Sequence, residues 1–391
     1  MKNIVISGWY GNENCGDEVI LQEIVRNVKS IDKHSNIVVM SFNIKHTNDV
    51  HNLTAVNQIP IHNLSTIKSF IKGNLFETIK NIRKCDLFMM GGGGFLSDWQ
   101  NEVPFGWLKQ MILAKMYNRK TILYGIGAGP FNTKGGKRKV AFIINKFVDY
   151  VLVRDKISEE ELISCGVNKA KVILGIDPVF NVMTEKQNSL KKEKVIGINL
   201  VELFNSEEYW SNSKKRHKIL IDKFISLIFN INKKYPDYKL RFIPMMKSDA
   251  SFIENILKSN PLLKMEIDKN CLNNIEYTKK CIAECEIFIG MRCHSLILSL
   301  SYAIPTIGIV YHHKSLEAMK NYGMEDKCIY ITDEKQSNLG NFDLDVDKLL
   351  MNLEEIINKS NVIKEDIISN RNGIEERMKK NIDILKEALN N

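Results

Sequence analysis

Short apolar segments alternate with amphipathic segments of helical length along most of this 391-residue chain. Predicted strands occupy residues 3–7, 87–90 and 121–124, and helical patterns occupy residues 106–118 and 136–147. Strands separated by helices form βαβ units, which build a mostly parallel sheet that is covered on both faces. The sequence therefore predicts an α/β fold.

The chain is longer than a single hydrophobic core usually supports, so we expect two domains. The strand–helix pattern stops in a polar, lysine-rich segment at residues 184–194 and resumes with an apolar strand at 195–200. We place an N-terminal Rossmann-like domain at residues 1–185 and a C-terminal one at 195–350, facing each other across a central cleft. The highly charged residues 351–391 have helical periodicity and are expected to pack against the body as one or two helices.

Composition limits the cellular location and the kinds of partner. The longest apolar segments are shorter than the roughly 20 residues that span a bilayer, and residues 1–7 are typical of a strand rather than a signal peptide, so we expect a cytoplasmic protein. The net charge of +9 favours anionic partners, such as phosphorylated small molecules and acidic membrane surfaces. Nucleic acid is not expected, because the chain has no helix-turn-helix, zinc-finger or aromatic–basic pattern.

The eight cysteines do not follow a metal-binding pattern. No Cys-x-x-Cys pair occurs, and no histidine is spaced to complete a zinc site. Cys281 and Cys285 lie four residues apart without a second pair nearby, which indicates reduced, buried thiols. No metal is predicted.

The sharpest chemical signal lies where the apolar strand Cys285–Ile289 runs into a helical segment at 295–302. Gly290, Arg292 and His294 occupy this junction. The carboxyl end of a parallel strand followed by a helix N-terminus binds anions, because the helix-terminal N–H groups and the helix dipole favour negative charge. A guanidinium binds anions and an imidazole transfers protons near neutral pH, so we take Arg292 and His294 as the chemical centre.

The first predicted strand ends in a glycine-rich loop, Gly8–Glu18, before a helix predicted at Glu18–Ile31. The glycine spacing matches neither the G-x-G-x-x-G dinucleotide fingerprint nor the P-loop, so NAD and ATP are disfavoured. Asp17 in this loop has two interpretations, a ligand-binding carboxylate or a cap of the following helix.

Later strand ends in the first half are also rich in glycine or charge. Four consecutive glycines, Gly91–Gly94, follow the strand at 87–90, and their entropic cost favours a loop that a ligand approaches closely. Asp98 lies where it could bind a hydroxyl or act as a base, with helix capping as the alternative. Gly125–Gly129 and Arg154 end the next two strands. Because the ends of parallel strands lie on one edge of a sheet, these loops are expected to converge on one cleft.

Four further segments complete this view of the cleft. Lys314 follows a strand in the second half and is expected within reach of the anion at Arg292, with a solvated loop lysine as the alternative. Asp177 ends the first domain and is expected to be structural. Residues 43–80 and 202–216 are expected to be acceptor-binding loops.

Taken in order, these loops resemble those of the polysaccharide pyruvyl transferase family, over about residues 3 to 325. Each motif alone is weak, but the ordered set is specific. The motifs that carry the resemblance are Gly8-Trp9-Tyr10-Gly11-Asn12, Gly16-Asp17-Glu18, Gly91-Gly92-Gly93 with Leu96 and Asp98, Gly125-Ile126-Gly127 with Gly129-Pro130, Val153-Arg154-Asp155 with Ser158, Asp177-Pro178-Val179, Gly290-Met291-Arg292-Cys293-His294-Ser295-Leu296, Pro305, Gly308 and Lys314.

The resemblance implies a glycosyltransferase-B-like fold and transfer of a pyruvyl group from phosphoenolpyruvate to a sugar, which forms a cyclic ketal. Family members use an Arg-Leu-His tripeptide to bind phosphoenolpyruvate and assist catalysis, and here it is Arg292-Cys293-His294. The resemblance implies no cofactor beyond this donor substrate, and it allows a lipid-linked sugar acceptor with transient contact at the inner membrane surface. The sequence does not indicate the oligomeric state.

The residue roles that follow are expectations. His294 would donate or relay the proton, Arg292 would bind phosphoenolpyruvate, and either Asp98 or Asp17 would handle the acceptor hydroxyls. The expected substrate-binding residues are Arg154, Lys314, Asp17, Gly92, Gly93, Gly127 and Ser295.

Two other functions fit the same fold. A nucleotide-sugar-dependent glycosyltransferase would bind a diphosphate at the same helix N-terminus, and it would require an acidic residue on the ribose that we cannot locate in the sequence. A non-catalytic protein that binds an envelope polymer would tolerate the loss of Arg292 and His294.

Overall fold

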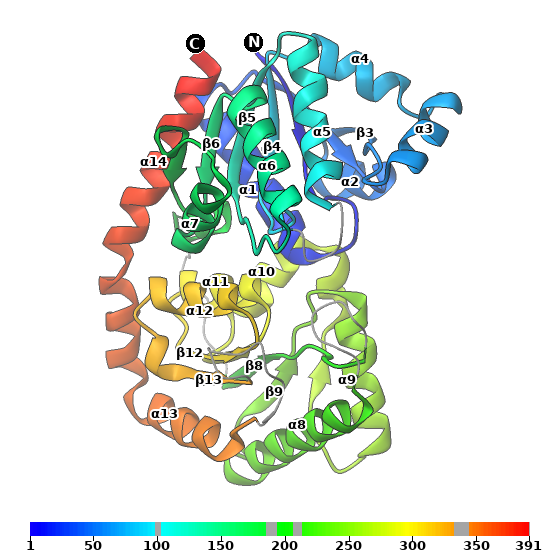
Figure 1. Cartoon of the computed structure of the whole chain (residues 1–391). Helices are drawn as coiled ribbons and strands as arrows, with labels where there is room; N and C mark the ends of the chain where they lie inside the picture. The colour runs from blue at the N-terminus through cyan, green and yellow to red at the C-terminus, as the bar shows by residue number, and fades with distance from the viewer. Residues whose placement is uncertain (98–102, 185–193, 206–212, 332–343, 391) are drawn as a thin grey trace. The chain divides into compact units, whose positions relative to one another are not determined.

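The computed structural model describes residues 1–97, 103–184, 194–205, 213–331 and 344–390. The chain divides into two compact units, and each is described here by itself (Figure 1). Unit 1 comprises Met1–Asn181 with Ile374–Asn391, and unit 2 comprises Val182–Gly373. Most of the lysine-rich segment 184–194 lies outside the described residues.

Unit 1 is built on a seven-stranded sheet with the order β3-β2-β1-β4-β5-β6-β7, and its strands pair in parallel. The strands are β1 Asn3–Ser7, β2 Asn36–Ser41, β3 Thr54–Asn57, β4 Leu87–Gly91, β5 Lys120–Ile126, β6 Tyr150–Val153 and β7 Val172–Leu174. The helices are α1 Cys15–Ile31, α2 Ile44–His51, α3 Asn63–Ile71, α4 Phe76–Lys84, α5 Val103–Met116, α6 Lys134–Phe147, α7 Lys156–Cys165 and α14 Arg371–Asn390. The 3-10 helix η1 Lys169–Lys171 lies just before β7, and the 3-10 helix η2 Pro178–Thr184 follows β7.

Unit 2 repeats the design with a six-stranded parallel sheet in the order β10-β9-β8-β11-β12-β13. The strands are β8 Val195–Asn199, β9 Lys239–Phe242, β10 Glu266–Ile267, β11 Ile287–Gly290, β12 Thr306–Val310 and β13 Cys328–Tyr330. The helices are α8 Lys214–Lys234, α9 Lys247–Ser259, α10 Ile275–Ala283, α11 Cys293–Ser301, α12 His313–Asn321 and α13 Val346–Ser369, with the 3-10 helices η3 Lys269–Asn273 and η4 Glu325–Lys327.

The central strands are buried along their whole length. Every residue of β4, β8 and β12 is buried, as expected for parallel strands that are covered by helices on both faces. In unit 1, Trp107 and Met111 of α5 are fully buried in the core that packs on this sheet. The predicted α/β class with parallel sheets is therefore confirmed.

Several helices begin two or three residues before their predicted starts, because polar side chains cap them further upstream. Asn14 accepts from Gly16 N–H, so α1 begins at Cys15 rather than at Glu18. Ser213 caps α8 in the same way, through Arg216 N–H. The apolar periodicity locates the body of each helix, and the cap fixes its first residue.

The prediction that residues 43–80 form a loop is wrong. This segment contains α2, β3, α3 and part of α4. Strand β3 has only two buried residues, Ala55 and Val56, and this apolar segment is too short to predict a strand from the sequence. The segment 202–216 lies partly outside the described residues.

Helix α14 comes from the end of the chain and packs in unit 1, where it fixes the turn after β7. Asn381 is buried, and its amide accepts from Ile176 N–H at 3.1 Å and donates to Ile176 C=O at 2.8 Å. The Asn381 side chain thereby provides hydrogen-bond partners for the N–H and C=O groups of Ile176, which lies outside the strands of the sheet. Residues 205 positions apart in the sequence are joined in this way.

Replacing Asn381 with Leu should destabilise unit 1 by about 3 kcal/mol, because Ile176 would keep a buried donor and acceptor without partners. Urea denaturation of the full chain measures this as a lower transition midpoint. Asn390→Leu on the same helix is the control, because Asn390 is exposed. Equal midpoints for the two variants would show that the Asn381 amide does not stabilise the unit.

Candidate functional site

The end of strand β11 and the start of helix α11 form a junction that is held by a side chain from the neighbouring strand. Asn199, fully buried at the end of β8, accepts from Arg292 N–H at 3.1 Å through Oδ1. Its Nδ2 donates to Ile243 C=O at 3.0 Å, which fixes the orientation of the amide. Arg292 is the N-cap residue of α11. The backbone of the predicted chemical centre is therefore fixed by a tertiary contact.

The guanidinium of Arg292 forms a bidentate ion pair with Asp249 in the first turn of α9. Nε donates to Oδ2 at 2.8 Å, and Nη2 donates to Oδ1 at 2.6 Å. Asp249 is buried and also accepts from the Met245 and Met246 N–H groups. Two parallel charge-assisted hydrogen bonds fix the plane of the guanidinium, whose side chain is only 12% exposed. Asp249 was not identified from the sequence.

His294 and Ser295 lie in the first turn of α11. His294 is partly exposed, whereas Ser295 is fully buried. The Ser295 hydroxyl lies 2.7 Å from Arg292 C=O, to which it donates. Ser295 therefore stabilises the junction, and its hydroxyl points into the protein.

Helix α12 begins beside this junction and brings more basic side chains to it. Cys293 Sγ donates to Lys314 C=O at 3.3 Å, and the Ser315 hydroxyl donates to Met291 C=O at 2.9 Å. Lys314 is partly exposed in the first turn of α12. The N-termini of α11 and α12 are therefore adjacent, and the Lys314 backbone lies beside the Arg292 segment. Contact of its side chain with an anion at Arg292 stays a prediction.

Two histidines at the start of α12 were not chosen from the sequence. His312 caps the helix by accepting from Lys314 N–H at 3.3 Å, and its ring packs against His313 with the centroids 4.0 Å apart. Their place after a strand, at the start of a helix, is the same signal that pointed to Arg292 and His294. Of the three residues His312, His313 and Lys314, only Lys314 was predicted from the sequence to lie near the anion.

In unit 1 the glycine-rich strand ends lie against one another. Gly127 N–H donates to Gly93 C=O at 2.8 Å, so the loops after β4 and β5 are joined. A Cβ on Gly93 would lie 3.7 Å from Asp17 Oδ1, and Gly92 has a φ of +65° that favours glycine. A Cβ on Gly127 would lie 3.0 Å from Arg154 Nε. The structure thus brings together the predicted residues of this sheet edge, apart from Asp98, which lies outside the described residues.

Arg154 in this group is buried between two carboxylates. Nη1 donates to Asp177 at 2.7 Å, and Nε lies 3.4 Å from Asp155. Asp155 in turn caps α7 through Ser158 N–H. These contacts give Arg154 a clear structural role in joining the ends of β6 and β7, beside the ligand-binding role expected from the sequence. Asp177 is structural, as expected.

The glycine-rich loop after β1 is fixed by Glu18 and by two histidines of α2. Glu18 is buried, accepts from Gly11 N–H at 2.8 Å, and pairs with His51 Nε2 at 2.7 Å and His46 Nε2 at 3.8 Å. Asp17 precedes it in the first turn, so the interpretation of Asp17 as the helix cap is wrong, since Asn14 is the cap. Asp17 and Glu18 are both acids in the first turn of α1, and ligand binding by Asp17 stays a prediction.

The pKa of the Tyr10 hydroxyl is influenced by the carboxylates at this sheet edge. It donates to Gly91 C=O, and its pKa is raised well above the ordinary value. Burial is the largest cause, and the other causes are the carboxylates of Asp17, Glu18 and Asp177. The edge of the unit 1 sheet therefore carries several carboxylates, of which Glu18 and Asp177 have basic partners. The edge of the unit 2 sheet carries Arg292, which is paired with Asp249, together with Lys314 and three histidines. The convergence of both edges on one cleft stays a prediction.

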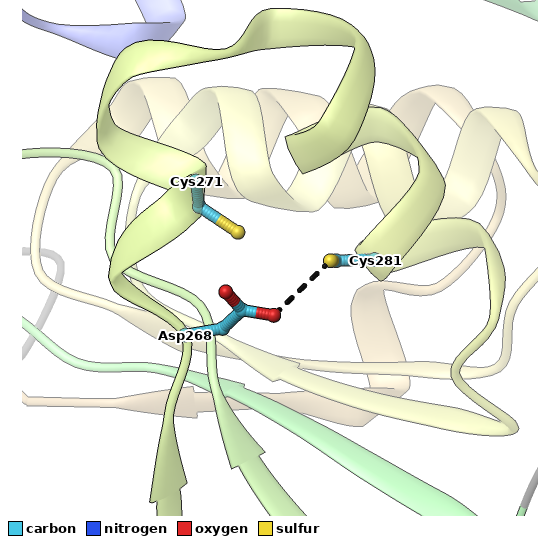
Figure 2. A group of neighbouring side chains, drawn as sticks. All are labelled: Asp268, Cys271 and Cys281. Carbon is cyan, nitrogen blue, oxygen red and sulfur yellow. Dashed lines mark hydrogen bonds between the residues drawn. The ribbon is translucent and has the colours of Figure 1, made fainter.

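One group of side chains has the donor types of a metal site. The oxygens of Asp268 and the sulfurs of Cys271 and Cys281 lie within 4.8 Å of one another (Figure 2). Hydrogen bonds account for the arrangement, since Asp268 accepts from Cys281 Sγ at 3.4 Å, from the Tyr277 hydroxyl at 2.9 Å and from Asn270 N–H at 3.3 Å. The hydrogen bond with Cys281 is the largest cause that raises the pKa of Cys271, and burial adds to it, which opposes a thiolate at Cys271. The same hydrogen bond lowers the pKa of Cys281. Three donors are also one fewer than a closed zinc site uses.

Among the described residues, no helix is long and apolar enough to cross a membrane.

Solved structures with this architecture are numerous. The chain resembles UDP-GlcNAc 2-epimerase from Neisseria meningitidis bound to UDP-GlcNAc, with a TM-score of 0.62 and 13% identity over 99% of this chain and 100% of that one. It resembles S. aureus MnaA, solved with UDP, with a TM-score of 0.63 and 12% identity over 100% and 97% of the two chains. At these identities the likeness shows the fold alone, and it confirms the predicted glycosyltransferase-B-like class.

Sequence comparison identifies the family. The chain is 24% identical over 293 residues to the amylovoran biosynthesis protein AmsJ of Erwinia amylovora, which covers 70% of this chain and 68% of that protein. The family model for polysaccharide pyruvyl transferase matches residues 14–313, which include the glycine-rich ends of β4 and β5 in unit 1 and the Arg292 junction of unit 2. The chain therefore belongs to the polysaccharide pyruvyl transferase family, and it is a transferase of polysaccharide biosynthesis.

Proposed function

We propose that this protein transfers a pyruvyl group from phosphoenolpyruvate to two hydroxyls of a sugar and so forms a cyclic ketal. The acceptor would be a cell-surface polysaccharide or its lipid-linked precursor. The observation that carries the proposal is the β11–α11 junction, where Asp249 fixes the Arg292 guanidinium and His294 occupies the first turn of the helix. Membership of the family supports the same reaction class.

The basic edge of unit 2 suits the charge of the donor. Phosphoenolpyruvate carries a carboxylate and a phosphate, so it needs cations and N–H donors on more than one side. The adjacent N-termini of α11 and α12 supply N–H groups and favourable dipoles, and Arg292 and Lys314 supply charge. Because Asp249 fixes the guanidinium before the substrate arrives, Arg292 would lose little side-chain entropy on binding.

His294 would supply the proton that starts the reaction. Protonation of the methylene carbon of the enol converts C2 into an electrophile, and a sugar hydroxyl attacks C2. Phosphate then leaves and takes the electron pair of its C–O bond, and the second hydroxyl attacks the same carbon to close the ketal. An imidazole suits the first step because it exchanges protons near neutral pH. The scheme uses no cofactor.

The carboxylates of unit 1 would handle the acceptor. Asp17 lies beside the Gly93 backbone, and the Phe95 ring also lies close to this glycine. A carboxylate there would orient or deprotonate an acceptor hydroxyl. Asp98 is the other candidate for this role.

Arg292→Lys should raise the Kd for phosphoenolpyruvate about 10- to 100-fold, because a charge-assisted hydrogen bond to the substrate is lost. The rise in melting temperature on adding phosphoenolpyruvate measures this, since a ligand that binds only the native state stabilises it. Lysine keeps a cation beside Asp249, which limits the effect on folding. Arg138→Lys is the matched control, because Arg138 is exposed on α6.

Titration with UDP and GDP separates this proposal from a nucleotide-sugar glycosyltransferase. Stabilisation of the wild-type protein by a nucleotide but not by phosphoenolpyruvate would refute the donor assignment. An unchanged phosphoenolpyruvate response in Arg292→Lys would refute the role of Arg292.

His294→Gln should lower the rate of pyruvyl transfer at least about 100-fold, with a much smaller effect on the Kd for phosphoenolpyruvate, because the amide cannot act as a general acid. Phosphate release from phosphoenolpyruvate, with a panel of sugars that carry neighbouring hydroxyls, measures the rate. His313→Gln is the control, because it changes a nearby histidine at the start of α12. A variant that loses binding rather than rate would assign His294 to binding instead of proton transfer.

A further inference from the structure

In helix α3 of unit 1 the polar face lies toward the protein and the apolar face is exposed, the reverse of an ordinary surface helix. Its inward face is polar, since the Thr66 hydroxyl donates to Pro60 C=O at 2.8 Å and accepts from Lys109 Nζ of α5 at 2.7 Å. Lys109 also donates to Ile61 C=O at 3.0 Å, and burial lowers its pKa to about 8. No residue of α3 is buried. A helix on a globular surface normally turns its apolar stripe inward, so this one must be stabilised by something else.

The outward face of α3 is apolar and exposed. Leu64, Ile67 and Ile71 have the i, i+3, i+7 spacing of one helix face, and they are 75%, 56% and 77% exposed. Phe70 is 64% exposed beside them, and Phe76 at the start of α4 is 70% exposed. Figure 1 shows α3 and α4 at the periphery of unit 1, near the edge strand β3. We call these five side chains the α3 patch.

Two lysines lie beside the apolar residues of α3. Lys68 and Lys72 are exposed on α3 and just after it, and no Asp or Glu occurs between Asp49 and Glu77. Apolar side chains flanked by lysines are typical of a helix that lies in a membrane interface. The nearest acidic residue in the sequence after the patch, Glu77 beside Phe76, forms an ion pair with Lys80. The chain as a whole carries a net charge of +9, which attracts it to an anionic surface.

We propose that the α3 patch docks this protein on an anionic lipid bilayer, with the patch inserted among the lipids and Lys68 and Lys72 at the headgroups. This proposal names the membrane-contacting surface, which the proposed transfer to a lipid-linked acceptor would use. It rests on the exposure and charge of α3, so it can fail without affecting the donor assignment.

A second copy of the chain fits the α3 patch less well than a bilayer does. A symmetric dimer through α3 would bring Lys68 and Lys72 of both copies to one apolar interface, with no acidic residue on α3 to pair with them. Anionic headgroups pair with these lysines and leave the apolar side chains to the acyl region. The charge pattern therefore favours the membrane.

Co-sedimentation with phosphatidylcholine vesicles that contain phosphatidylglycerol tests the proposal, with the full chain and without phosphoenolpyruvate. The wild-type protein should bind these vesicles, and added salt should weaken the binding without abolishing it, because the apolar contribution is not screened. The double variant Leu64→Ser/Ile71→Ser should bind at least about tenfold more weakly. Lys68→Gln/Lys72→Gln should bind the anionic vesicles about 10- to 30-fold more weakly than the wild-type protein. This loss should not occur with vesicles of phosphatidylcholine alone.

Two matched controls use exposed residues elsewhere. Phe142→Ser/Leu262→Ser removes two exposed apolar side chains outside the patch, and Lys134→Gln/Lys139→Gln removes two lysines from α6. Both controls should bind more tightly than the corresponding α3 variants. All α3 variants should keep the wild-type melting temperature and the wild-type response to phosphoenolpyruvate, because the substituted side chains are exposed on α3 or just after it.

Three results would overturn the proposal. The first is no binding of the wild-type protein to anionic vesicles. The second is an equal loss of vesicle binding in the α3 variants and their controls. That result would mean that the net charge or non-specific hydrophobic adsorption drives the association. The third is a wild-type dimer in size-exclusion chromatography that Leu64→Ser/Ile71→Ser converts to a monomer without a change in vesicle binding.

Discussion

Burial of the parallel strands on both faces determines where polar chemistry can lie in this protein. Strands such as β4, β8 and β12 are buried at every residue, so a charged side chain within them would have no partner and no water. The chain therefore places its charged and polar groups at the carboxyl ends of the strands. Arg154, Arg292 and Lys314 all follow this rule, and so does the buried Asn199.

The two sheet edges differ in the charged residues that they carry. In unit 1, Asp17, Glu18 and Asp177 are close enough to raise the pKa of the Tyr10 hydroxyl, although burial is the larger cause. In unit 2, Arg292 and Lys314 stand at adjacent helix N-termini. Carboxylates bind neutral hydroxyl groups well, and a basic edge binds a phosphorylated acid well. The proposed donor site in unit 2 and the proposed acceptor site in unit 1 follow this difference in residue types.

Much of the candidate site could be predicted from local sequence, and its supporting residues could not. Arg292 and His294 stand out because glycine, a cation and an imidazole follow an apolar strand within five residues. Asp249 lies 43 residues from Arg292, and Asn199 lies 93 residues from it, and neither has a local motif that marks its role. The same holds for His46 and His51, which reach Glu18 from a helix that the sequence analysis took for a loop. Contacts between distant residues depend on strand order, which local periodicity does not contain.

The sequence by itself determined the class of most segments outside residues 43–80, because apolar periodicity distinguishes buried strands from amphipathic helices. It also determined the family, because the ordered loop motifs are continuous in the chain. Only the tertiary structure decided that Asp249 fixes Arg292, that α14 packs with unit 1, and that α3 turns Thr66 inward and Leu64 outward. The physical reason is that a periodic pattern shows that a helix has two faces, whereas the surrounding fold decides which face meets the protein.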